Sequence, residues 1–413
     1  VAGVLATAGR AGDRGAASAA QLNAPRGIAV DEEAGILYIA DAGNHAVRAL
    51  GLTDGRLTTL AGVLGSGGLS GDGAPAAESL LHFPHGLAVD RAARQLFVSE
   101  PYNHAVRTVD LVRGVLSTVA GVLGVPGRGG DGMRSRAAHL HFPCGLALDA
   151  SARQLYVADA NNHAVRLVDL TTGLTSTVTG RFGSPGRAGP RGPAAAAQLD
   201  YPTGVAVDPA ARKLYIADRQ NHAIRAMDLG AWALLTAAGA LGHEGASGGP
   251  LATARLRSPR AVALNPPARE AYVADASNHV VKVLSLDTQE MATVVGGTDS
   301  IVALRLTFPC GVAVDAASQP PRLFVADTGS HVVYSVDLAR RTASAVAGVA
   351  TALGEAPAGP LRRPYGLALD GPGGALYIAD SGNHAIRVLT LATGELVAVA
   401  GRPGADGHRG DGD

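Results

Sequence analysis

The sequence predicts an all-β fold in which seven four-stranded antiparallel sheets are arranged around a common axis. A segment containing one histidine recurs seven times, at intervals of 52 to 59 residues. Each repeat holds four runs of four to eight residues that are rich in Val, Ile, Leu and Tyr, with Gly, Asp, Asn and Pro between them. Runs this short and this often interrupted predict strands and not helices. Consecutive strands joined by tight turns form a meander, and seven such sheets bury both faces by packing about 10 Å apart.

The first repeat shows the order of the elements. It opens with Pro25-Arg26-Gly27, and the run GIAVD predicts a first strand over 27–31. The run LYIAD predicts a second strand over 37–41, and a turn that ends in Asn44-His45 follows it. The runs HAVRAL at 45–50 and LTTLAG at 57–62 predict the third and fourth strands. A glycine-rich linker then leads to the next proline.

The number of sheets follows from the number of histidines, because fixed-period repeats each supply one structural unit. The repeats are centred on His45, His104, His163, His222, His279, His331 and His384. We therefore expect one β-propeller over residues 1–413, with seven blades. A six-bladed ring and a part of a longer array remain as alternatives.

The repeats resemble a known family. The segments YIADAGNHAVR at 38–48 and YIADSGNHAIR at 377–387 are similar to NHL repeats, which take their name from an Asn-His-Leu motif. The linkers at 61–86 and 120–145 resemble the long glycine-rich version found in teneurin-like and bacterial NHL proteins. The resemblance implies a β-propeller, usually with six blades. It implies little about function, because one fold hosts many functions.

The recurring histidines and the acids before them invite a metal hypothesis, but geometry favours a structural role. Zinc needs nitrogen ligands about 2.0–2.1 Å away, whereas equivalent residues of neighbouring blades lie about 10 Å apart. We expect the imidazoles to bond backbone and pack between blades. We expect the acids to accept hydrogen bonds from backbone N–H groups in tight turns, with calcium binding as the alternative. The acids are Asp41, Glu100, Asp159, Asp218, Asp275, Asp327 and Asp380.

Basic residues three positions after the histidine form a second recurring set. We interpret them as solvated residues of the outer strands that pair with acids on the blade surface. They are Arg48, Arg107, Arg166, Arg225, Lys282 and Arg387, and Tyr334 takes this position in the sixth repeat.

The middle residue of each Pro-x-Gly triplet varies while its neighbours recur. By resemblance to the family, this position opens the innermost strand and forms a ring around the mouth of the channel. Binding usually depends on loops held by a rigid scaffold, so this ring is a candidate site. Its members are Arg26, His85, Cys144, Thr203, Arg260, Cys310 and Tyr365. The two cysteines are three repeats apart, too far for a disulfide.

The linkers are expected to add positive charge to the same face. They contain 13 arginines against eight acids. The residues predicted to contact a partner are Arg26, His85, Thr203, Arg260, Tyr365, Arg134, Arg187 and Arg362.

The leading functional hypothesis is a non-enzymatic scaffold that binds another protein, within a larger assembly, through this loop face. We expect no catalytic residues, no metal, no cofactor and no small-molecule substrate. The formal net charge is zero and aromatic residues are few, so nucleic acid is a disfavoured partner. The alternatives are a metal-dependent lyase or hydrolase and an RNA-binding NHL module. No apolar run is long enough to span a membrane. An extracellular, cell-surface or assembly-associated location, for example ciliary, is favoured.

Overall fold

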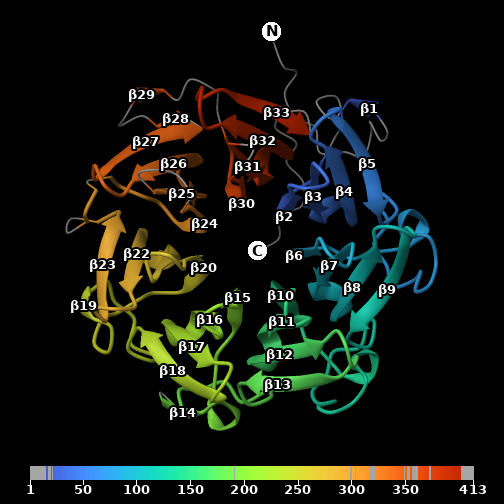
Figure 1. Ribbon diagram of the computed structural model, residues 1–413, viewed down its shortest axis with the longest axis horizontal. Helices are drawn as coiled ribbons and strands as arrows, with labels where there is room; N and C mark the ends of the chain where they lie inside the picture. The colour runs from blue at the N-terminus through green and yellow to red at the C-terminus, as the bar shows by residue number, and fades with distance from the viewer. Residues whose placement is uncertain are drawn as a thin grey trace.

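Seven blades surround a central channel in the computed structural model (Figure 1). The structure describes residues 15–16, 20, 22–189, 191–297, 300–302, 304–316, 321–347, 349–350, 354–355, 361–371 and 374–400. All helices among these residues are single 3₁₀ turns. None of these helices has the length and apolar character needed to cross a membrane. The predicted all-β fold with seven four-stranded antiparallel blades is confirmed.

The first four blades follow one another along the chain. Blade 1 contains β2 (Pro25–Asp31), β3 (Ile36–Asp41), β4 (Ala46–Gly51) and β5 (Arg56–Ala61). Blade 2 contains β6 (Leu87–Asp90), β7 (Gln95–Glu100), β8 (Ala105–Asp110) and β9 (Val115–Ala120). Blade 3 contains β10 (Pro143–Asp149), β11 (Gln154–Asp159), β12 (Ala164–Asp169) and β13 (Thr175–Thr179). Blade 4 contains β15 (Pro202–Asp208), β16 (Lys213–Asp218), β17 (Ala223–Asp228) and β18 (Ala233–Ala238).

The remaining three blades repeat this order. Blade 5 contains β20 (Pro259–Asn265), β21 (Glu270–Asp275), β22 (Val280–Ser285) and β23 (Glu290–Val295). Blade 6 contains β24 (Pro309–Asp315), β25 (Arg322–Asp327), β26 (Val332–Asp337) and β27 (Thr342–Ala347), followed by the short pair β28 (Val349–Ala350) and β29 (Gly354–Glu355). Blade 7 contains β30 (Pro364–Asp370), β31 (Ala375–Asp380), β32 (Ala385–Thr390) and β33 (Leu396–Ala400).

The linkers of blades 1 to 5 run along the outer edges of the blades that they precede. In blades 1, 4 and 5 a linker segment pairs with the outermost strand as a fifth strand. These segments are β1 (Gly15–Ala16), β14 (Arg191–Pro193) and β19 (Gly249–Pro250). The linkers of blades 2 and 3 make single bridges in the same place, Pro75 to Val115 and Arg134 to Leu174. Linker residues are therefore divided between the loop face and the outer edge of the ring.

The apolar core lies between the blades. Each apolar cluster joins two neighbouring sheets, as where Val47 of blade 1 packs with Leu96 and Val98 of blade 2. The cluster with Ile39 and Ile386 joins blade 1 to blade 7 and closes the ring. Among the described residues each blade is one continuous stretch of chain, so the two ends of the ring share no strand within one sheet. Val1-Ala2-Gly3, which resembles the end of a fourth strand, lies outside the described residues.

The recurring histidines connect each blade to the next, as expected. Their Nδ1 atoms accept hydrogen bonds of 2.8 to 3.2 Å from the backbone N–H of the residue before the next blade's proline. The acceptor and donor pairs are His45 with Phe83, His104 with Phe142, His163 with Tyr201, His222 with Ser258, His279 with Phe308, His331 with Arg363, and His384 with Ala24. The last pair closes the ring.

The recurring acids are buried and organise the interior of each blade. Asp159 accepts hydrogen bonds from the backbone N–H of His141 at 2.7 Å and from the side chain of Asn162 at 2.8 Å. The first donor, His141, belongs to the linker before the first strand, so the carboxylate fixes this linker. The prediction that the carboxylate accepts from the backbone of its own turn is therefore wrong. Burial raises the pKa of Asp159 to about 7, against the lowering effect of these donors.

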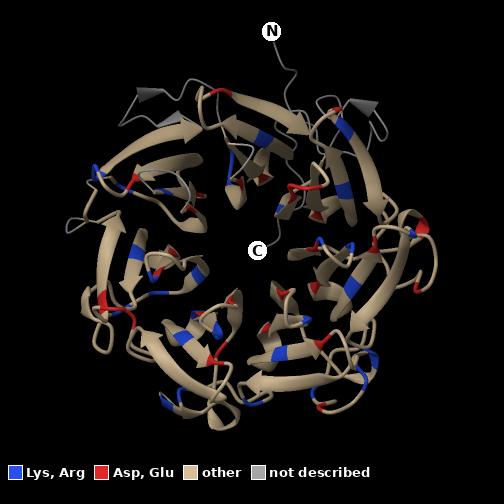
Figure 2. Cartoon of the chain, in the orientation of Figure 1, with Lys and Arg blue, Asp and Glu red and all other residues tan. Residues whose placement is uncertain are grey.

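The basic residues of the third strands are buried, and the prediction that they are solvated is wrong. Figure 2 shows them along the third strands. Arg48, Arg107, Arg166, Arg225 and Lys282 are 0% exposed, and Arg387 is 7% exposed. Arg225 lies 3.4 Å from the carboxylate of Asp218 on the neighbouring strand. Arg107 and Arg166 also reach Asp72 and Asp131 of the preceding linkers. A buried guanidinium is retained because these partners replace water.

We predict that the histidine bonds weaken below pH 6.5. Burial lowers the pKa of His104, so the folded protein binds this proton less readily than the unfolded chain. The contribution of His104 is therefore complete above pH 6.5 and is lost as the pH falls through the folded pKa. At pH 7.5, His104→Asn should lower the free energy of unfolding by about 1–3 kcal/mol, because the N–H of Phe142 loses its acceptor. At pH 5 this difference should shrink.

Urea unfolding at both pH values checks this prediction, with His243→Asn as the control. His243 is an exposed linker residue, so its substitution should change stability little at either pH. A loss for His104→Asn that is equal at pH 7.5 and pH 5 would contradict the assigned bond.

A second prediction concerns the buried ion pairs. Arg166→Leu removes the cation beside Asp159, whose carboxylate lies 3.7 Å away, and leaves that acid buried. We expect the free energy of unfolding to fall by about 3–5 kcal/mol. Arg113→Leu is the control, because Arg113 is 81% exposed and should contribute less than about 1 kcal/mol. If urea unfolding shows equally small effects for the two substitutions, Arg166 is solvated and the buried ion pair is contradicted.

Candidate binding site at the channel mouth

The start of each first strand forms a ring around the channel. In every blade except the fifth, where Ala261 replaces the glycine, the glycine of the Pro-x-Gly triplet faces the carbonyl of the middle residue in the next blade. A Cβ atom placed on Gly27 would lie 2.1 Å from the carbonyl oxygen of His85, and one on Gly366 would lie 2.5 Å from that of Arg26. Six of the seven ring positions therefore use glycine, which allows the close approach to the backbone carbonyl of the middle residue. This close approach does not use the side chain of the middle residue, which can therefore make other contacts.

Three ring side chains turn back into the blades or bond their neighbours. Cys144 and Cys310 are buried free thiols that donate to the carbonyls of Phe142 and Phe308, with Sγ–O distances of 3.6 and 3.7 Å. Burial raises the pKa of Cys144 to about 12. Thr203 Oγ1 donates to the carbonyl of Arg260 at 3.4 Å. Thr203 is thus part of the ring's own bonding.

The other four ring side chains gather at the channel mouth with aromatic neighbours. The guanidinium of Arg26 lies 5.1 Å from the ring centroid of Tyr365 and 5.7 Å from that of Phe83. The ring of His85 meets Tyr365 edge to face at 6.2 Å. Arg260 lies over Phe308 at 4.8 Å. The structure thus brings together Arg26, His85 and Tyr365, which come from blades 1, 2 and 7.

Arg219 joins this group and was missed by the sequence analysis. It opens the turn η8 (Arg219–Asn221) of blade 4, and its guanidinium lies 5.6 Å from the ring centroid of Tyr201. Burial and the charge of Arg260 lower its pKa. The available signal was that the other six repeats place Ala, Pro, Thr or Ser at this turn position. We call Arg26, Arg219 and Arg260 the mouth arginines.

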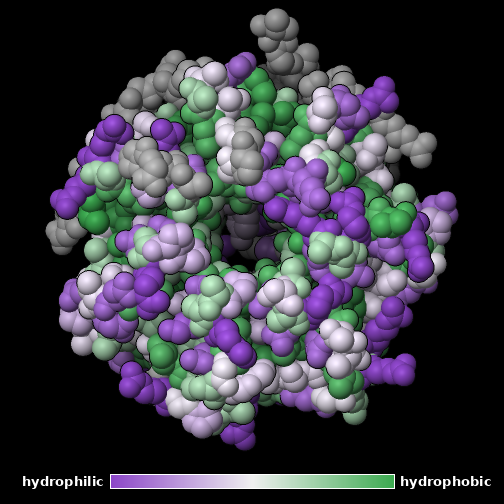
Figure 3. Space-filling model, viewed as in Figure 1, coloured by the Kyte–Doolittle hydropathy of each residue, from purple (hydrophilic) through white to green (hydrophobic). Residues whose placement is uncertain are grey.

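The mouth arginines have no acidic partner among the residues that the structure describes. They make no ion pair and no hydrogen bond there, and the Nε atom of each is buried without an acceptor. Burial and the charges of Arg26 and Arg260 lower the pKa of His85 to about 4, so His85 is neutral at pH 7. The mouth therefore carries three positive charges. Figure 3 shows one face of the molecule, hollowed at the axis.

Aromatic side chains are also concentrated near the mouth. Tyr102, on the turn η4 (Pro101–Asn103) of blade 2, is 51% exposed and contacts Phe83 and Phe142 at centroid distances of 5.4 and 5.5 Å. Tyr102 was not among the predicted contact residues. Aromatic residues are few in the sequence, and their positions in it do not show that these ones lie side by side.

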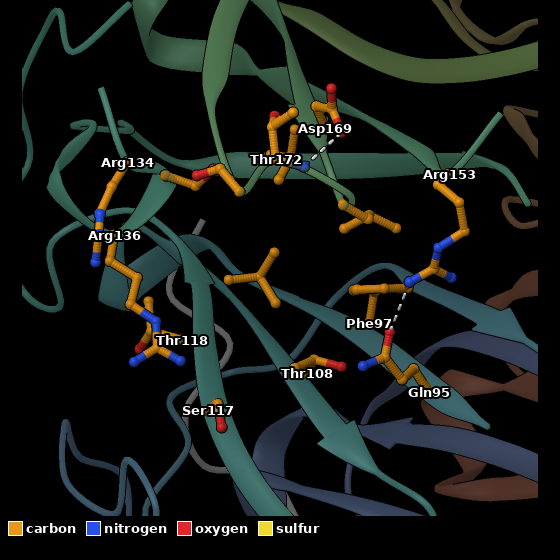
Figure 4. A pocket seen from close by; sticks show the side chains of 15 residues that line it. Gln95, Phe97, Thr108, Ser117, Thr118, Arg134, Arg136, Arg153, Asp169 and Thr172 are labelled. Atoms are coloured by element: carbon orange, nitrogen blue, oxygen red, sulfur yellow. Dashed lines mark hydrogen bonds between the residues drawn. The ribbon is translucent and has the colours of Figure 1, made fainter. Parts of the chain in front are cut away.

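The predicted linker arginines separate into two groups. Arg187 and Arg362 are exposed and lie near the turns of the loop face. Arg187 lies beside Gly242, whose N–H donates to the carbonyl of Asn221 in η8, and Arg362 lies beside Gly382 in the turn η10 (Ser381–Asn383). Arg134 does not lie at the mouth. It lines a pocket of about 550 Å³ between blades 2 and 3, together with Arg136 and Arg153 (Figure 4). Its linker runs along the outer edge of blade 3, which explains the separation.

The ring offers little for a metal ion. Among the described residues, no three His, Cys, Asp or Glu side chains lie close enough together to hold one. At the mouth itself the charges of Arg26 and Arg260 surround His85 and would repel a cation.

The fold and the ring define the class of this protein as a seven-bladed β-propeller. The NHL repeat family matches residues 22–50, 199–227 and 361–389, which lie in blades 1, 4 and 7. Three blades of this β-propeller therefore match NHL repeats.

Two curated relatives share the repeats. Protein SUPPRESSOR OF QUENCHING 1, chloroplastic, of Arabidopsis thaliana is 28% identical over 335 residues, which cover 77% of this chain and 31% of that protein. NHL repeat-containing protein 2 of Gallus gallus is 28% identical over 298 residues, which cover 66% of this chain and 40% of that protein. The chain thus spans less than half the length of these relatives.

Two solved structures share the fold. Streptogramin B lyase has a TM-score of 0.58 at 11% identity and covers 87% of this chain and 92% of its own. Kuenenia stuttgartiensis hydrazine synthase has a TM-score of 0.57 at 12% identity, and the match covers 89% of this chain and 95% of that chain. At this identity the likeness shows the fold alone.

Proposed function

We propose that this propeller is a non-enzymatic scaffold that binds a partner protein through its loop face, at the mouth of the channel. The contact residues are the ring residues Arg26, His85, Thr203, Arg260 and Tyr365, joined by Arg219 and Tyr102 and flanked by Arg187 and Arg362. Arg134 lies away from this surface and would contact only a partner that also reaches the outer edge.

One observation carries the proposal: among the described residues, the side chains of Arg26, His85 and Tyr365 make none of the hydrogen bonds that join the blades, and they lie together at the channel mouth. The repeated His, Asp, Asn and Arg side chains bond inside or between blades, whereas Arg26, His85 and Tyr365 contribute only backbone to the ring. Their side chains are presented on a rigid frame, which reduces the entropy lost on binding. Arg and Tyr are also the residues that most often anchor protein interfaces.

The same contacts disfavour RNA as the partner. Single-stranded RNA is bound largely by stacking of bases on aromatic faces. At this mouth a guanidinium already lies over Tyr201, Phe308 and Tyr365. Tyr102 is the exposed exception.

Cross-linked affinity capture from the source cells tests the proposal. The bait is the full chain, either wild type or with Arg26→Ala, Arg260→Ala and Tyr365→Ala combined. We expect a specific partner, quantified by mass spectrometry, to fall by about tenfold or more with the triple variant, because it removes three anchor side chains. The variant should still fold, because the hydrogen bonds that join the blades are made by the recurring histidines and not by these side chains.

The matched control substitutes Arg113, Trp232 and Arg340 by Ala. These residues are 81%, 47% and 71% exposed and lie in turns between third and fourth strands, at the opposite end of the blades. Partner recovery should stay near wild type. A partner retained by the ring variant and lost by the control would move the interface to the opposite face.

A further inference from the structure

The mouth arginines differ from the buried arginines of the blades. Arg225 bonds the carbonyl of Gln198 and lies 3.4 Å from Asp218, and Arg166 lies 2.9 Å from Asp131. The charges of these guanidinium groups are balanced by the neighbouring carboxylates. Arg26, Arg219 and Arg260 contact aromatic rings instead, and within the described ranges they have no carboxylate or carbonyl partner. The described part of the chain therefore leaves three half-buried cations without a counter-charge around one opening.

The way these arginines are held leaves them able to bind an anion. A ring that covers the face of a guanidinium leaves its N–H groups free, since these lie in the plane of the group. The N–H edge matches a carboxylate, which accepts two parallel hydrogen bonds from one arginine. Stacking also fixes the side chain in advance, so less entropy is lost when the anion binds.

The three arginines approach the opening from different sides. Arg219 and Arg260 belong to the neighbouring blades 4 and 5, whereas Arg26 belongs to blade 1. The charge of Arg260 acts on Arg219 and also on His85, in blade 2 across the ring. An acidic group that enters along the axis would meet cations from both sides. Tyr365, which contacts Arg26 and His85, lies within the same group.

We propose that Arg26, Arg219 and Arg260 form a carboxylate-binding site, which takes the side chains of an acidic segment of the partner protein at the channel mouth. This inference rests on the proposed function and deepens it by naming the chemistry of the partner. A site of three cations in one opening fits a few clustered Asp or Glu side chains. A nucleic-acid backbone instead favours an extended basic track, and the covered aromatic faces leave little room for bases.

Binding of a short fluorescent oligoglutamate peptide to the full chain tests the site. Fluorescence anisotropy at low salt gives the dissociation constant, and an oligoglutamine peptide of the same length is the neutral probe. Arg219→Gln, Arg26→Gln and Arg260→Gln should each weaken oligoglutamate binding by about tenfold, the effect of one charge-assisted contact. Arg219→Lys should bind with intermediate affinity, because it keeps the charge and loses the planar fork.

Two controls keep the test specific. Arg113→Gln removes an exposed arginine at the opposite end of blade 2 and should bind oligoglutamate like the wild type. Thermal unfolding of every variant should match the wild type within a few degrees, which separates loss of the site from loss of the fold. Inorganic phosphate should displace the peptide only weakly, since the site is assigned to several carboxylates on one chain.

Three results would overturn the carboxylate site. They are equal binding of oligoglutamate to wild type and Arg219→Gln, equal binding of oligoglutamate and oligoglutamine, and phosphate binding that depends on the mouth arginines and is as tight as peptide binding. The last would indicate a small-anion site. If oligoglutamate fails while the capture experiment still maps a partner to the mouth, the proposed function stands and the carboxylate site falls. If oligoglutamate binds through the mouth arginines but no partner protein is captured, the carboxylate site stands and the proposed function falls.

Discussion

The buried carboxylate at the end of each second strand is the interaction on which the rest of the blade depends. An unpaired buried charge is costly, so this group must collect donors. In blade 1, Asp41 accepts from the backbone of Asn23, from the side chain of Asn44 and from Arg48. One acid thereby fixes the linker, the turn and the third strand. Blade 2 meets the same requirement with Glu100, which accepts from the backbone of His82 and from Asn103.

The carboxylate also prepares the contact between blades. The turn that it holds ends with a histidine in the left-handed conformation, as at His45 with φ 56°. From there Nδ1 accepts from the N–H of Phe83, which is itself left-handed with φ 53° and directly precedes Pro84. Left-handed backbone is unfavourable for such residues and persists because the bonds on both sides hold it. The start of the next first strand, and hence the ring position, is set by this chain of bonds.

The sequence was sufficient for the period, the strand order and the structural role of the histidines, because these depend on local pattern and repetition. The sequence led to a wrong prediction for Arg48 and its equivalents. We placed them in solvent because they are charged residues in strands predicted to lie on the outside. Their burial depends on Asp41 in the neighbouring strand, seven residues earlier, and the sequence alone does not show that this acid faces inward. It failed for Arg134 because nothing in a glycine-rich linker shows which segment pairs along a strand edge. Arg219 was visible only as an exception in a turn position that is otherwise uncharged.

The formal net charge of zero is a sum over two different populations of charge. The acids and arginines inside the blades neutralise each other at short range, as Arg225 and Asp218 do, and present no field to a partner. Among the described residues the mouth arginines have no such partner, and burial together with the charge of Arg260 lowers the pKa of Arg219. Since repulsion between like charges weakens a fold, a protein selected only for stability would favour neutral side chains at these ring and turn positions. Composition therefore describes the average of the chain and does not show the few charges that lack a partner among the described residues.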